Sequence, residues 1–213
     1  MIDYEASTFV LARHLTDQRR SRIERVLSGR IGNVCLVLES LQDPFNVSAC
    51  MRTAEAFGVQ YVHVIEPSAP MDIEGLVSLR AEKWLTVTRE ANPEAAARFL
   101  SGNFYTLLVS TPEPVAPPLS EMDLTGPIAL AFGNETSGIS PELERLASRR
   151  FHIPMRGFTQ SLNVTVSVAV SLRELFLSPR FGAEPLPADE TARLRYEWYK
   201  ASVSPRILEH LDL

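Results

Sequence analysis

The sequence is poor in the residues that proteins use to bind metals or to cross-link a chain. It holds two cysteines and four histidines in 213 residues. Cys35 and Cys50 both lie in apolar segments and lack the spacing of metal ligands. This excludes a disulfide framework and a zinc site of the usual kind. We expect both cysteines to be buried and reduced, and the protein to use no metal.

Long hydrophobic runs are also absent. No apolar stretch approaches the roughly 20 residues that span a bilayer, so the sequence predicts no membrane helix. The first residues, MIDYEASTF, contain acids and no basic residue. We therefore expect no signal peptide. Together with reduced cysteines, these features indicate a cytoplasmic protein.

A strong positive charge is missing as well, but the charge is uneven along the chain. The formal net charge is −5, which argues against indiscriminate binding to nucleic acids. Residues 13–30 nevertheless carry a local charge of +4, whereas residues 66–144 carry −8. The simplest interpretation of the positive segment is a solvated helix face. It becomes an RNA-binding candidate only if the rest of the chain describes an enzyme that acts on RNA. The arginines concerned are Arg13, Arg19, Arg20, Arg22, Arg25 and Arg30.

Strand-length apolar runs alternate with helical patterns through the middle of the chain. The periodicity also predicts helical structure over residues 7–28, as one bent helix or two. The stretch between the second and third strands looks irregular. The predicted strands are 33–40, 61–67, one near 84–87, 104–110, 127–133 and 149–154. The predicted helices are 46–59 with Asn46 as its N-cap, 93–101, 140–147 with proline in its first turn, and one that ends near residue 177.

This alternation predicts an α/β fold with a mostly parallel sheet flanked by helices. Pro179, Pro185 and Pro187 mark a linker, and a helical tail rich in charged residues follows. We therefore expect three parts: an arginine-rich helical arm at 1–30, an α/β domain at 31–178, and a linker with a helical tail at 179–213.

Three loops that follow predicted strands contain unusual polar residues. They read LQDPFNVSACMR, FGNETSG and PMRGFTQSLN, and they place Asn46, Glu135, Ser161 and Asn163 after strands. Each loop alone has an ordinary explanation, since Glu135 could be a solvated acid and Ser161 or Asn163 a helix cap. Ligands of parallel α/β sheets bind at the carboxyl ends of the strands. Three polar loops at that edge therefore predict a functional site.

In this order the loops resemble the three motifs of the SpoU/TrmH family of 2′-O-ribose RNA methyltransferases, within the SPOUT superfamily. The pattern N-x-x-x-x-x-R matches Asn46 and Arg52, and G-x-E-x-x-G matches Gly133, Glu135 and Gly138. The segment IPMRGFTQSLNVTVSVAV matches the third motif almost throughout. The resemblance covers about residues 22–178.

The resemblance implies a fold, a cofactor and an assembly. The family has a deep trefoil knot of the SPOUT type, which the periodicity by itself does not predict. It binds S-adenosyl-L-methionine in a bent form within the knot and works as a homodimer with both active sites at the interface. The residues implied in cofactor binding are Ser110, Gly133, Ile153, Met155 and Leu162.

The implied reaction is attack of a ribose 2′ oxygen on the sulfonium methyl group. His63 and His152 lie within predicted strands, so neither is an evident base. The resemblance assigns hydroxyl activation to Arg52, with Asn46, Glu135, Ser161 and Asn163 around it. Arginine is protonated near pH 7. Either a substrate phosphate and a dry interface help it to lose a proton, or Arg52 positions the hydroxyl and stabilises the developing oxyanion.

Among family members, the sequence is most similar to those that methylate guanosine 18 in the D-loop of tRNA. The segments QSLNVTVSVAV and RAEKWLTV carry this similarity, as do short helical extensions in place of a separate RNA-binding domain. The arm would then contact tRNA phosphates through Arg19, Arg20 and Arg22. The alternatives are another tRNA position, ribosomal RNA, or a catalytically silent RNA-binding relative.

Overall fold

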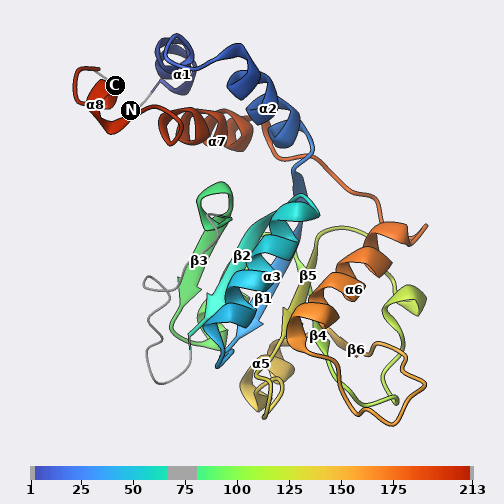
Figure 1. Ribbon diagram of the computed structural model, residues 1–213. Helices are drawn as coiled ribbons and strands as arrows, with labels where there is room; N and C mark the ends of the chain where they lie inside the picture. The colour runs from blue at the N-terminus through green and yellow to red at the C-terminus, as the bar shows by residue number, and fades with distance from the viewer. Residues whose placement is uncertain (1–2, 67–80, 212–213) are drawn as a thin grey trace. The chain divides into compact units, whose positions relative to one another are not determined.

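The computed structural model describes residues 3–66 and 81–211 (Figure 1). The chain divides into two compact units. We call Met1–Ile31 with Pro185–Leu213 the helical unit, and Gly32–Glu184 the sheet unit. The irregular stretch predicted after the second strand falls mostly on residues 67–80, outside the described residues. No helix in the described part of the chain is both long and apolar enough to cross a membrane.

The sheet unit is built on a six-stranded sheet with the order β3-β2-β1-β5-β4-β6. The pairs β1–β5, β2–β3, β4–β5 and β4–β6 are all parallel. The predicted α/β class with a mostly parallel sheet is confirmed. The strands are β1 (Ile31–Glu39), β2 (Val59–Ile65), β3 (Thr86–Glu90), β4 (Thr106–Ser110), β5 (Ile128–Phe132) and β6 (Arg149–Phe151).

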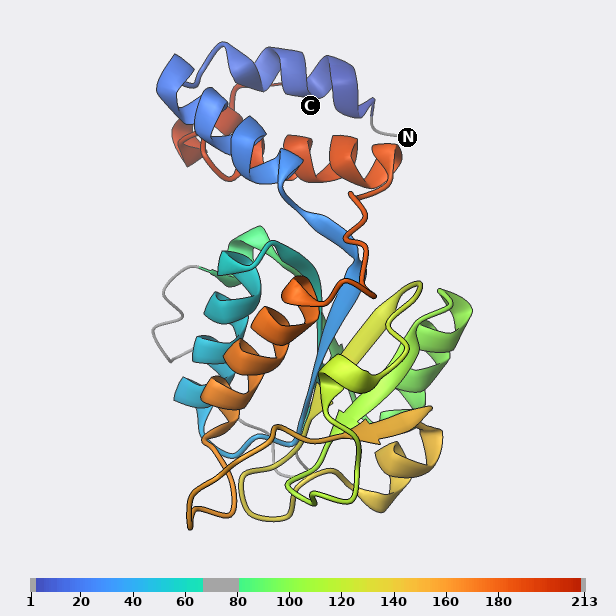
Figure 2. The ribbon, with the colours of Figure 1, turned by 90° about the vertical axis from the view of Figure 1, so that its right-hand side faces the viewer.

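Helices cover both faces of this sheet (Figure 2). On one face lie α3 (Pro44–Ala56) and α6 (Val164–Leu177), which contact each other through the stacked rings of Phe57 and Phe176. On the other face lie α4 (Pro93–Gly102) and α5 (Pro141–Leu146), packed on a core that includes Cys35 and Val37. Two short 3₁₀ turns, η1 (Glu82–Trp84) and η2 (Leu119–Glu121), complete the unit. Burial on both faces explains why β1 and β5 read as continuous apolar runs.

The prediction that Asn46 caps the helix after β1 is wrong. The helix α3 begins two residues earlier, at Pro44, and Asp43 is its N-cap. The Asp43 Oδ1 atom accepts a hydrogen bond from the Phe45 backbone N–H at 2.9 Å. Proline is favoured in the first turn because it has no N–H to leave unpaired and its φ is already helical. Asn46 therefore lies inside the first turn, and its side chain is free of the capping role.

The helical unit joins the two ends of the chain. It contains α1 (Tyr4–Ala12), α2 (Asp17–Ser28), α7 (Ala188–Lys200) and α8 (Pro205–Leu208). The N-terminal segment is thus two helices, because Thr16 starts a new one by accepting a hydrogen bond from the Arg19 N–H. The buried guanidinium of Arg30 lies over the Trp198 ring, 5.1 Å from its centroid, which is a cation–π contact.

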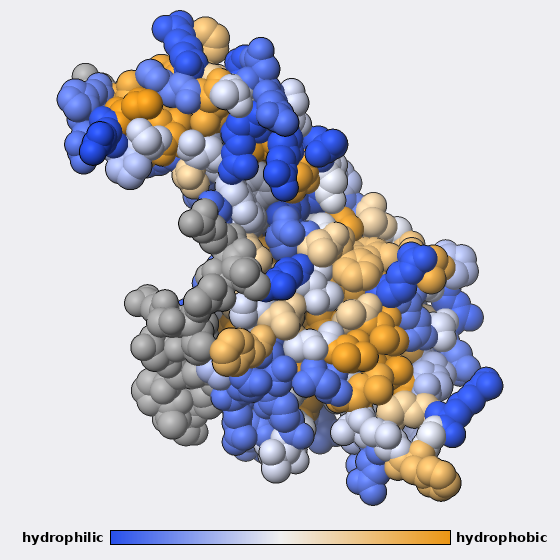
Figure 3. Space-filling view, in the orientation of Figure 1, coloured by the Kyte–Doolittle hydropathy of each residue, from blue (hydrophilic) through white to orange (hydrophobic). Residues whose placement is uncertain are grey.

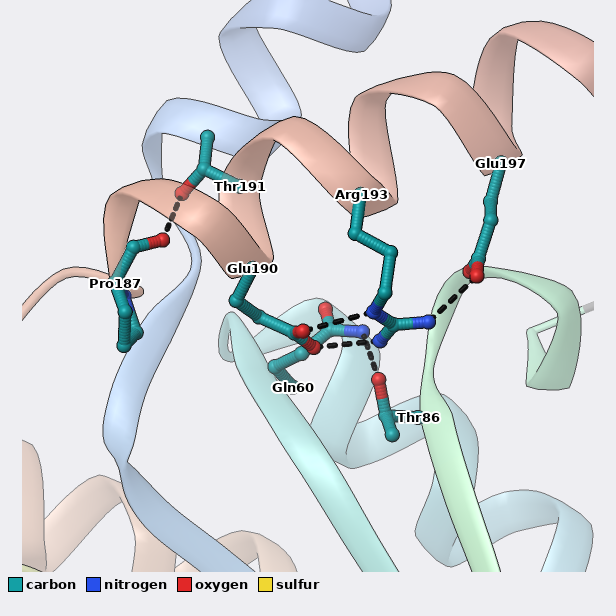
Figure 4. Close-up of polar contacts among 7 residues, drawn as sticks. All are labelled: Gln60, Thr86, Pro187, Glu190, Thr191, Arg193 and Glu197. Carbon is teal, nitrogen blue, oxygen red and sulfur yellow. Dashed lines mark hydrogen bonds and ion pairs between the residues drawn. The ribbon is translucent and has the colours of Figure 1, made fainter. Parts of the chain in front are cut away.

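Ion pairs link and stiffen the helices of this unit. Arg195 Nε donates to both carboxylate oxygens of Glu24, at 2.9 and 3.0 Å, and so joins α7 to α2. Along α7, Arg193 lies between Glu190 and Glu197 and hydrogen-bonds to both (Figure 4). These acids hold the pKa of Arg193 above its ordinary value. Much of the charge in the helical unit is therefore used within the unit.

Candidate active site

Strand register brings the three polar loops to one edge of the sheet. Leu38 of β1 pairs with Phe132 of β5, so the loops after these two strands lie next to each other. Ser110 at the end of β4 pairs with Phe151 at the end of β6. Because the strands β1, β5, β4 and β6 are consecutive in the sheet, their carboxyl ends form one continuous edge.

At this edge, one side chain from each loop joins a hydrogen-bonded chain. Asn46 Nδ2 donates to Glu135 Oε1 at 2.7 Å. Asn163 Nδ2 donates to Asn46 Oδ1 at 3.3 Å. The second carboxylate oxygen of Glu135 accepts a hydrogen bond from the Gln42 backbone N–H at 3.1 Å. Residues that are 89 and 117 positions apart in the sequence thus form one cluster.

The cluster keeps Glu135 ionised. Partial burial of the carboxylate acts to raise its pKa, but hydrogen bonds from Asn46 and from the Gln42 backbone outweigh that effect. The pKa of Glu135 therefore lies below its usual range. At neutral pH Glu135 is a fixed acceptor, which orients the amide of Asn46.

Asn163 has two roles at the start of α6. It is the N-cap, since its Oδ1 accepts hydrogen bonds from the Thr165 N–H at 2.8 Å and from Thr165 Oγ1 at 2.5 Å. Its Nδ2 remains available for Asn46. Ser161 has neither role, because it is exposed and makes no hydrogen bond to the described residues. Of the two residues that sequence reasoning proposed as caps or site residues, Asn163 is the cap.

Arg52 lies on α3 but away from the cluster. It lies six positions after Asn46, which corresponds to about 9 Å along the helix axis and about 120° around it. Its side chain is exposed and forms no hydrogen bond or ion pair with any described residue. Within one chain, the structure therefore brings together Asn46, Glu135 and Asn163, but it shows no contact of Arg52 or Ser161 with them.

The glycines of the second loop are explained by the loop itself. A Cβ atom on Gly133 would lie 2.3 Å from the backbone C and O of Gly138, which is too close for any side chain. Asn134 and Gly138 exchange two backbone hydrogen bonds, at 3.0 and 2.9 Å, and Gly138 has a positive φ of 73°. Close approach of the loop to its own backbone requires Gly133. Its predicted role toward a cofactor stays a prediction.

The residues predicted to bind a cofactor lie along the same edge. Ser110, Gly133, Ile153 and Met155 follow or end β4, β5 and β6 and are half-buried, while Leu162 is exposed. No backbone N–H from Ile153 to Leu162 donates a hydrogen bond within the described part of the chain. Such a loop fits a ligand that is held by main-chain groups.

Two residues that sequence reasoning missed support the second loop. Glu39 ends β1 and binds Ser140, and Asn134 binds the carbonyl of Ser40. An acid that closes an otherwise apolar strand was the available signal for Glu39. In residues 3–66 and 81–211, no three His, Cys, Asp or Glu side chains are grouped so as to hold a metal ion.

The three arginines predicted to contact RNA differ in their surroundings. Arg19 donates from Nε and Nη2 to Ser202 Oγ, at 3.1 and 3.0 Å. Arg20 forms an ion pair with Asp17 on the same helix. Arg22 is exposed and has no such partner among the described residues.

Comparisons with known proteins identify the family of this chain. The family model of the SpoU rRNA Methylase family matches residues 33–173. A tRNA (guanosine(18)-2′-O)-methyltransferase of Borreliella burgdorferi is 32% identical over 91% of this chain and 90% of its own. The enzyme of the same name from Thermus thermophilus is 36% identical over 76% of this chain and 84% of its own.

A solved structure, the A. aeolicus TrmH/SpoU tRNA modifying enzyme, has a similar fold. It superposes with a TM-score of 0.74 at 25% identity and covers 88% of this chain and 98% of that one. The family model covers more than half of the chain, and its match includes the loops after β1, β5 and β6. The chain belongs to the SpoU rRNA Methylase family.

Proposed function

We propose that this protein is an S-adenosylmethionine-dependent tRNA (guanosine-18-2′-O)-methyltransferase. The observation that carries the proposal is the hydrogen-bonded chain Asn163–Asn46–Glu135, to which each of the three motif loops contributes one residue. The names of the relatives from Borreliella burgdorferi and Thermus thermophilus support tRNA guanosine 18 as the target.

The residues present fit the cofactor. The free main-chain N–H groups between Ile153 and Leu162 can bind the adenosine part, and Ser110, Gly133 and Met155 border the same edge. When bound, S-adenosylmethionine supplies a methyl group made electrophilic by the positively charged sulfur to which it is attached. The protein then has to orient the attacking oxygen and to manage its proton.

Arg52, Asn46 and Glu135 have different roles in the reaction. Glu135 fixes the amide of Asn46, and Asn46 in turn orients Asn163. Arg52 keeps its proton near neutral pH, as arginines do, so it positions the 2′-hydroxyl and stabilises the negative charge that develops on the oxygen. The proton that the hydroxyl loses passes to solvent water, because Arg52 cannot accept it. Ser161 borders the ribose from the loop before α6.

The functional form is a homodimer, which brings Arg52 and Ser161 into a complete site at the interface. An exposed apolar stripe on α6 supports this assembly: Val166, Val170 and Leu177 are 45%, 38% and 61% exposed. Figure 3 shows apolar surface gathered over α6. Beside it lies a groove of about 620 Å³ that Val170 and Leu177 help to line. Surface stripes of this kind mark protein contacts, and we assign a second copy of the chain as the occupant.

The sheet unit is knotted in the manner of the SPOUT superfamily. Contacts of the segment between β4 and β5 support this topology. His152 after β6 donates its N–H to the carbonyl of Pro117. Glu174 on α6 accepts a hydrogen bond from the Ser120 N–H, and Arg180 donates to the carbonyls of Ser120 and Met122. These hydrogen bonds tie the segment between β4 and β5 to residues before and after the loop that follows β6.

The helical unit supplies RNA affinity from the arginine-rich arm at its N-terminus. Phosphate contacts position an RNA without reading its sequence, and exposed arginines are suited to them. The cytoplasm, where tRNA is available, is the proposed compartment, and the two free, buried cysteines are consistent with a reducing environment.

Methyl transfer to defined RNAs tests the proposal. The protein is incubated with isotopically labelled S-adenosylmethionine and an unmodified tRNA transcript, and the labelled nucleotide is mapped. Label is expected at guanosine 18, and none with a matched tRNA that carries 2′-deoxyguanosine there. EDTA should leave the rate unchanged, provided the RNA stays folded.

Other results would favour the alternatives. Label at a different tRNA position, or only in ribosomal RNA, would keep the chemistry and replace the substrate. Cofactor binding without methyl transfer to tRNA or ribosomal RNA would indicate a silent RNA-binding relative.

A further inference from the structure

The end of β1 is anchored to the loop after β5 by residues that have no assigned part in the reaction. Glu39, the last residue of β1, is 3% exposed. Its Oε2 accepts a hydrogen bond from the Ser140 N–H at 2.8 Å, and its Oε1 accepts one from Ser140 Oγ at 2.5 Å. The carbonyl of the next residue, Ser40, accepts a hydrogen bond from Asn134 Nδ2 at 2.7 Å.

Among the described residues, the buried carboxylate of Glu39 is held by hydrogen bonds from Ser140. No lysine, arginine or histidine in the described part of the chain forms an ion pair with it. Burial of an ionised carboxylate is unfavourable unless both oxygens find donors. Ser140 supplies a main-chain donor and a side-chain donor, and hydrogen bonds to a charged acceptor are the strong ones. Glu39 therefore holds Ser140 at two points.

The loop between the two anchors carries Glu135. Asn134 starts this loop, and its Oδ1 accepts hydrogen bonds from the N–H groups of Thr136 and Ser137, at 2.8 and 3.0 Å. Ser140 ends it and caps α5 by accepting a hydrogen bond from the Leu143 N–H. With both ends of the loop held at the end of β1, the carboxylate of Glu135 accepts hydrogen bonds from Asn46 and from the Gln42 N–H.

We propose that Glu39 is a positioning residue for methyl transfer: through Ser140 it holds the Asn134–Ser140 loop so that Glu135 stays bonded to Asn46. This inference rests on the proposed function, because it gives Glu135 a part in that reaction. Glu39 itself is buried beneath the loop and acts only through it.

Kinetics of Glu39→Gln test the proposal. The variant keeps the size of the side chain and replaces one acceptor by a donor. Glu90→Gln is the matched control, since Glu90 also ends a strand of this sheet and is 14% exposed, but it binds His63. We expect kcat about tenfold lower for Glu39→Gln, the scale of a slightly misplaced catalytic group, with KM for both substrates within about twofold. Glu90→Gln should keep kcat near wild type.

A double-mutant cycle separates positioning from a general loss of stability. If Glu39 acts through Glu135, then Glu39→Gln adds no further loss of kcat in a Glu135→Ala background. Ser140→Thr, which keeps the hydroxyl, should restore most of the activity that Ser140→Ala loses. Unchanged kcat in Glu39→Gln, or losses that simply multiply in the double variant, would overturn the proposal.

Amide hydrogen exchange gives a reading that needs no activity. The N–H groups of Gln42, Thr136 and Ser137 are protected by side-chain hydrogen bonds. In Glu39→Gln, but not in Glu90→Gln, they should exchange at least severalfold faster. Faster exchange in a protein whose wild type methylates no RNA would leave the positioning intact and reject the proposed function. Unchanged exchange would reject the positioning whatever the activity.

Discussion

The paired arginines of the helical unit contrast with Arg52 of the sheet unit, where Arg89, Arg145 and Arg150 do form ion pairs with glutamates. In the helical unit, Arg195 is bonded to Glu24, and Arg193 to two glutamates of its own helix. In the sheet unit, Arg52 is exposed and has no such partner among the described residues. A solvent-exposed ion pair contributes about 0–1 kcal/mol to stability. An arginine in such a pair is also less available to bind a phosphate of the RNA. The number of arginines in a segment therefore overstates its capacity to bind RNA.

The acids show the same contrast. Glu24 in the helical unit accepts hydrogen bonds from a guanidinium. Glu39 and Glu135 in the sheet unit accept theirs from hydroxyl, amide and backbone N–H groups, which are neutral. Neutral donors leave the negative charge of Glu135 in place, and because hydrogen bonds hold its pKa below the usual range, Glu135 keeps a charge at the candidate active site. Glu39 and Glu135 thus differ from Glu24, which is bonded to the guanidinium of Arg195.

The largest effect is expected from charge on the exposed face of α6. Val166→Glu with Val170→Glu should convert a homodimer to monomers and reduce methyl transfer at least about a hundredfold, because burying unpaired carboxylates in an interface is unfavourable. Sedimentation and activity are measured together. Val115→Glu, at a residue that is 78% exposed in a loop, is the control. A fully active monomer would contradict the shared site.

Arg52→Ala should lower methyl transfer on the order of a hundredfold while cofactor affinity stays within about twofold, as for the loss of one catalytic group. Arg98→Ala, at an exposed position on α4, should have no effect. Calorimetric titration with the cofactor and single-turnover rates separate the two steps.

Mixed dimers test whether Arg52 acts in a site that two copies of the chain share. If Arg52 finds its partners in the second copy, a mixed dimer of Arg52→Ala and Ser161→Ala chains regains one intact site and part of the activity. Near-normal turnover of Arg52→Ala would remove the residue from the mechanism.

Asn46→Ala should reduce kcat about tenfold and shift the pH profile. In the wild type, hydrogen bonds outweigh burial and lower the pKa of Glu135. The stabilisation from ionised Glu135 is thus present above its unfolded pKa and is lost as the pH falls through the lower folded pKa. Without Asn46, burial remains and one bond is gone, so the pKa of Glu135 rises. The acid limb of activity should therefore begin at a higher pH than in the wild type.

If the pH profile of kcat for Asn46→Ala coincides with that of the wild type, the ionisation of Glu135 has no part in the reaction. Thr53→Ala provides the control, because Thr53 lies on the same helix and, among the described residues, its hydroxyl bonds only to the carbonyl of Ala49.

The smallest effect is expected in the helical unit. Replacing exposed Arg13, Arg22 and Arg25 by alanine should weaken tRNA binding about tenfold and make its affinity less dependent on salt. A variant that neutralises fewer phosphates releases fewer counterions when it binds. Replacing Arg19 and Arg20, which bond to Ser202 and Asp17, should instead lower the melting temperature and change the salt slope less. Fluorescence anisotropy at several salt concentrations measures both. If the salt dependence of tRNA affinity is the same in all variants and in the wild type, these arginines do not contact the RNA.

Much of the fold could be predicted because its signals are local. The apolar runs of β1 and β5, the proline at the start of α5 and the asparagine at the start of α6 each identify an element within a few residues. The prediction for α3 was wrong by two residues because Asp43 with Pro44 competes as a helix start with Asn46. Arg30 counted as part of a positive segment, yet it is buried over Trp198, a contact between opposite ends of the chain.

By itself the sequence determined which segments become strands and helices, and which three loops carry polar residues, because periodicity and capping depend on neighbouring residues. Only the tertiary structure decided which side chains meet. Asn46 reaches Glu135 across 89 residues, and Glu24 reaches Arg195 across 171. These partners follow from the order of strands in the sheet and from the packing of the two chain ends, and no local pattern encodes either. The physical reason is that a hydrogen bond depends on distance in space, while a sequence pattern depends on distance along the chain.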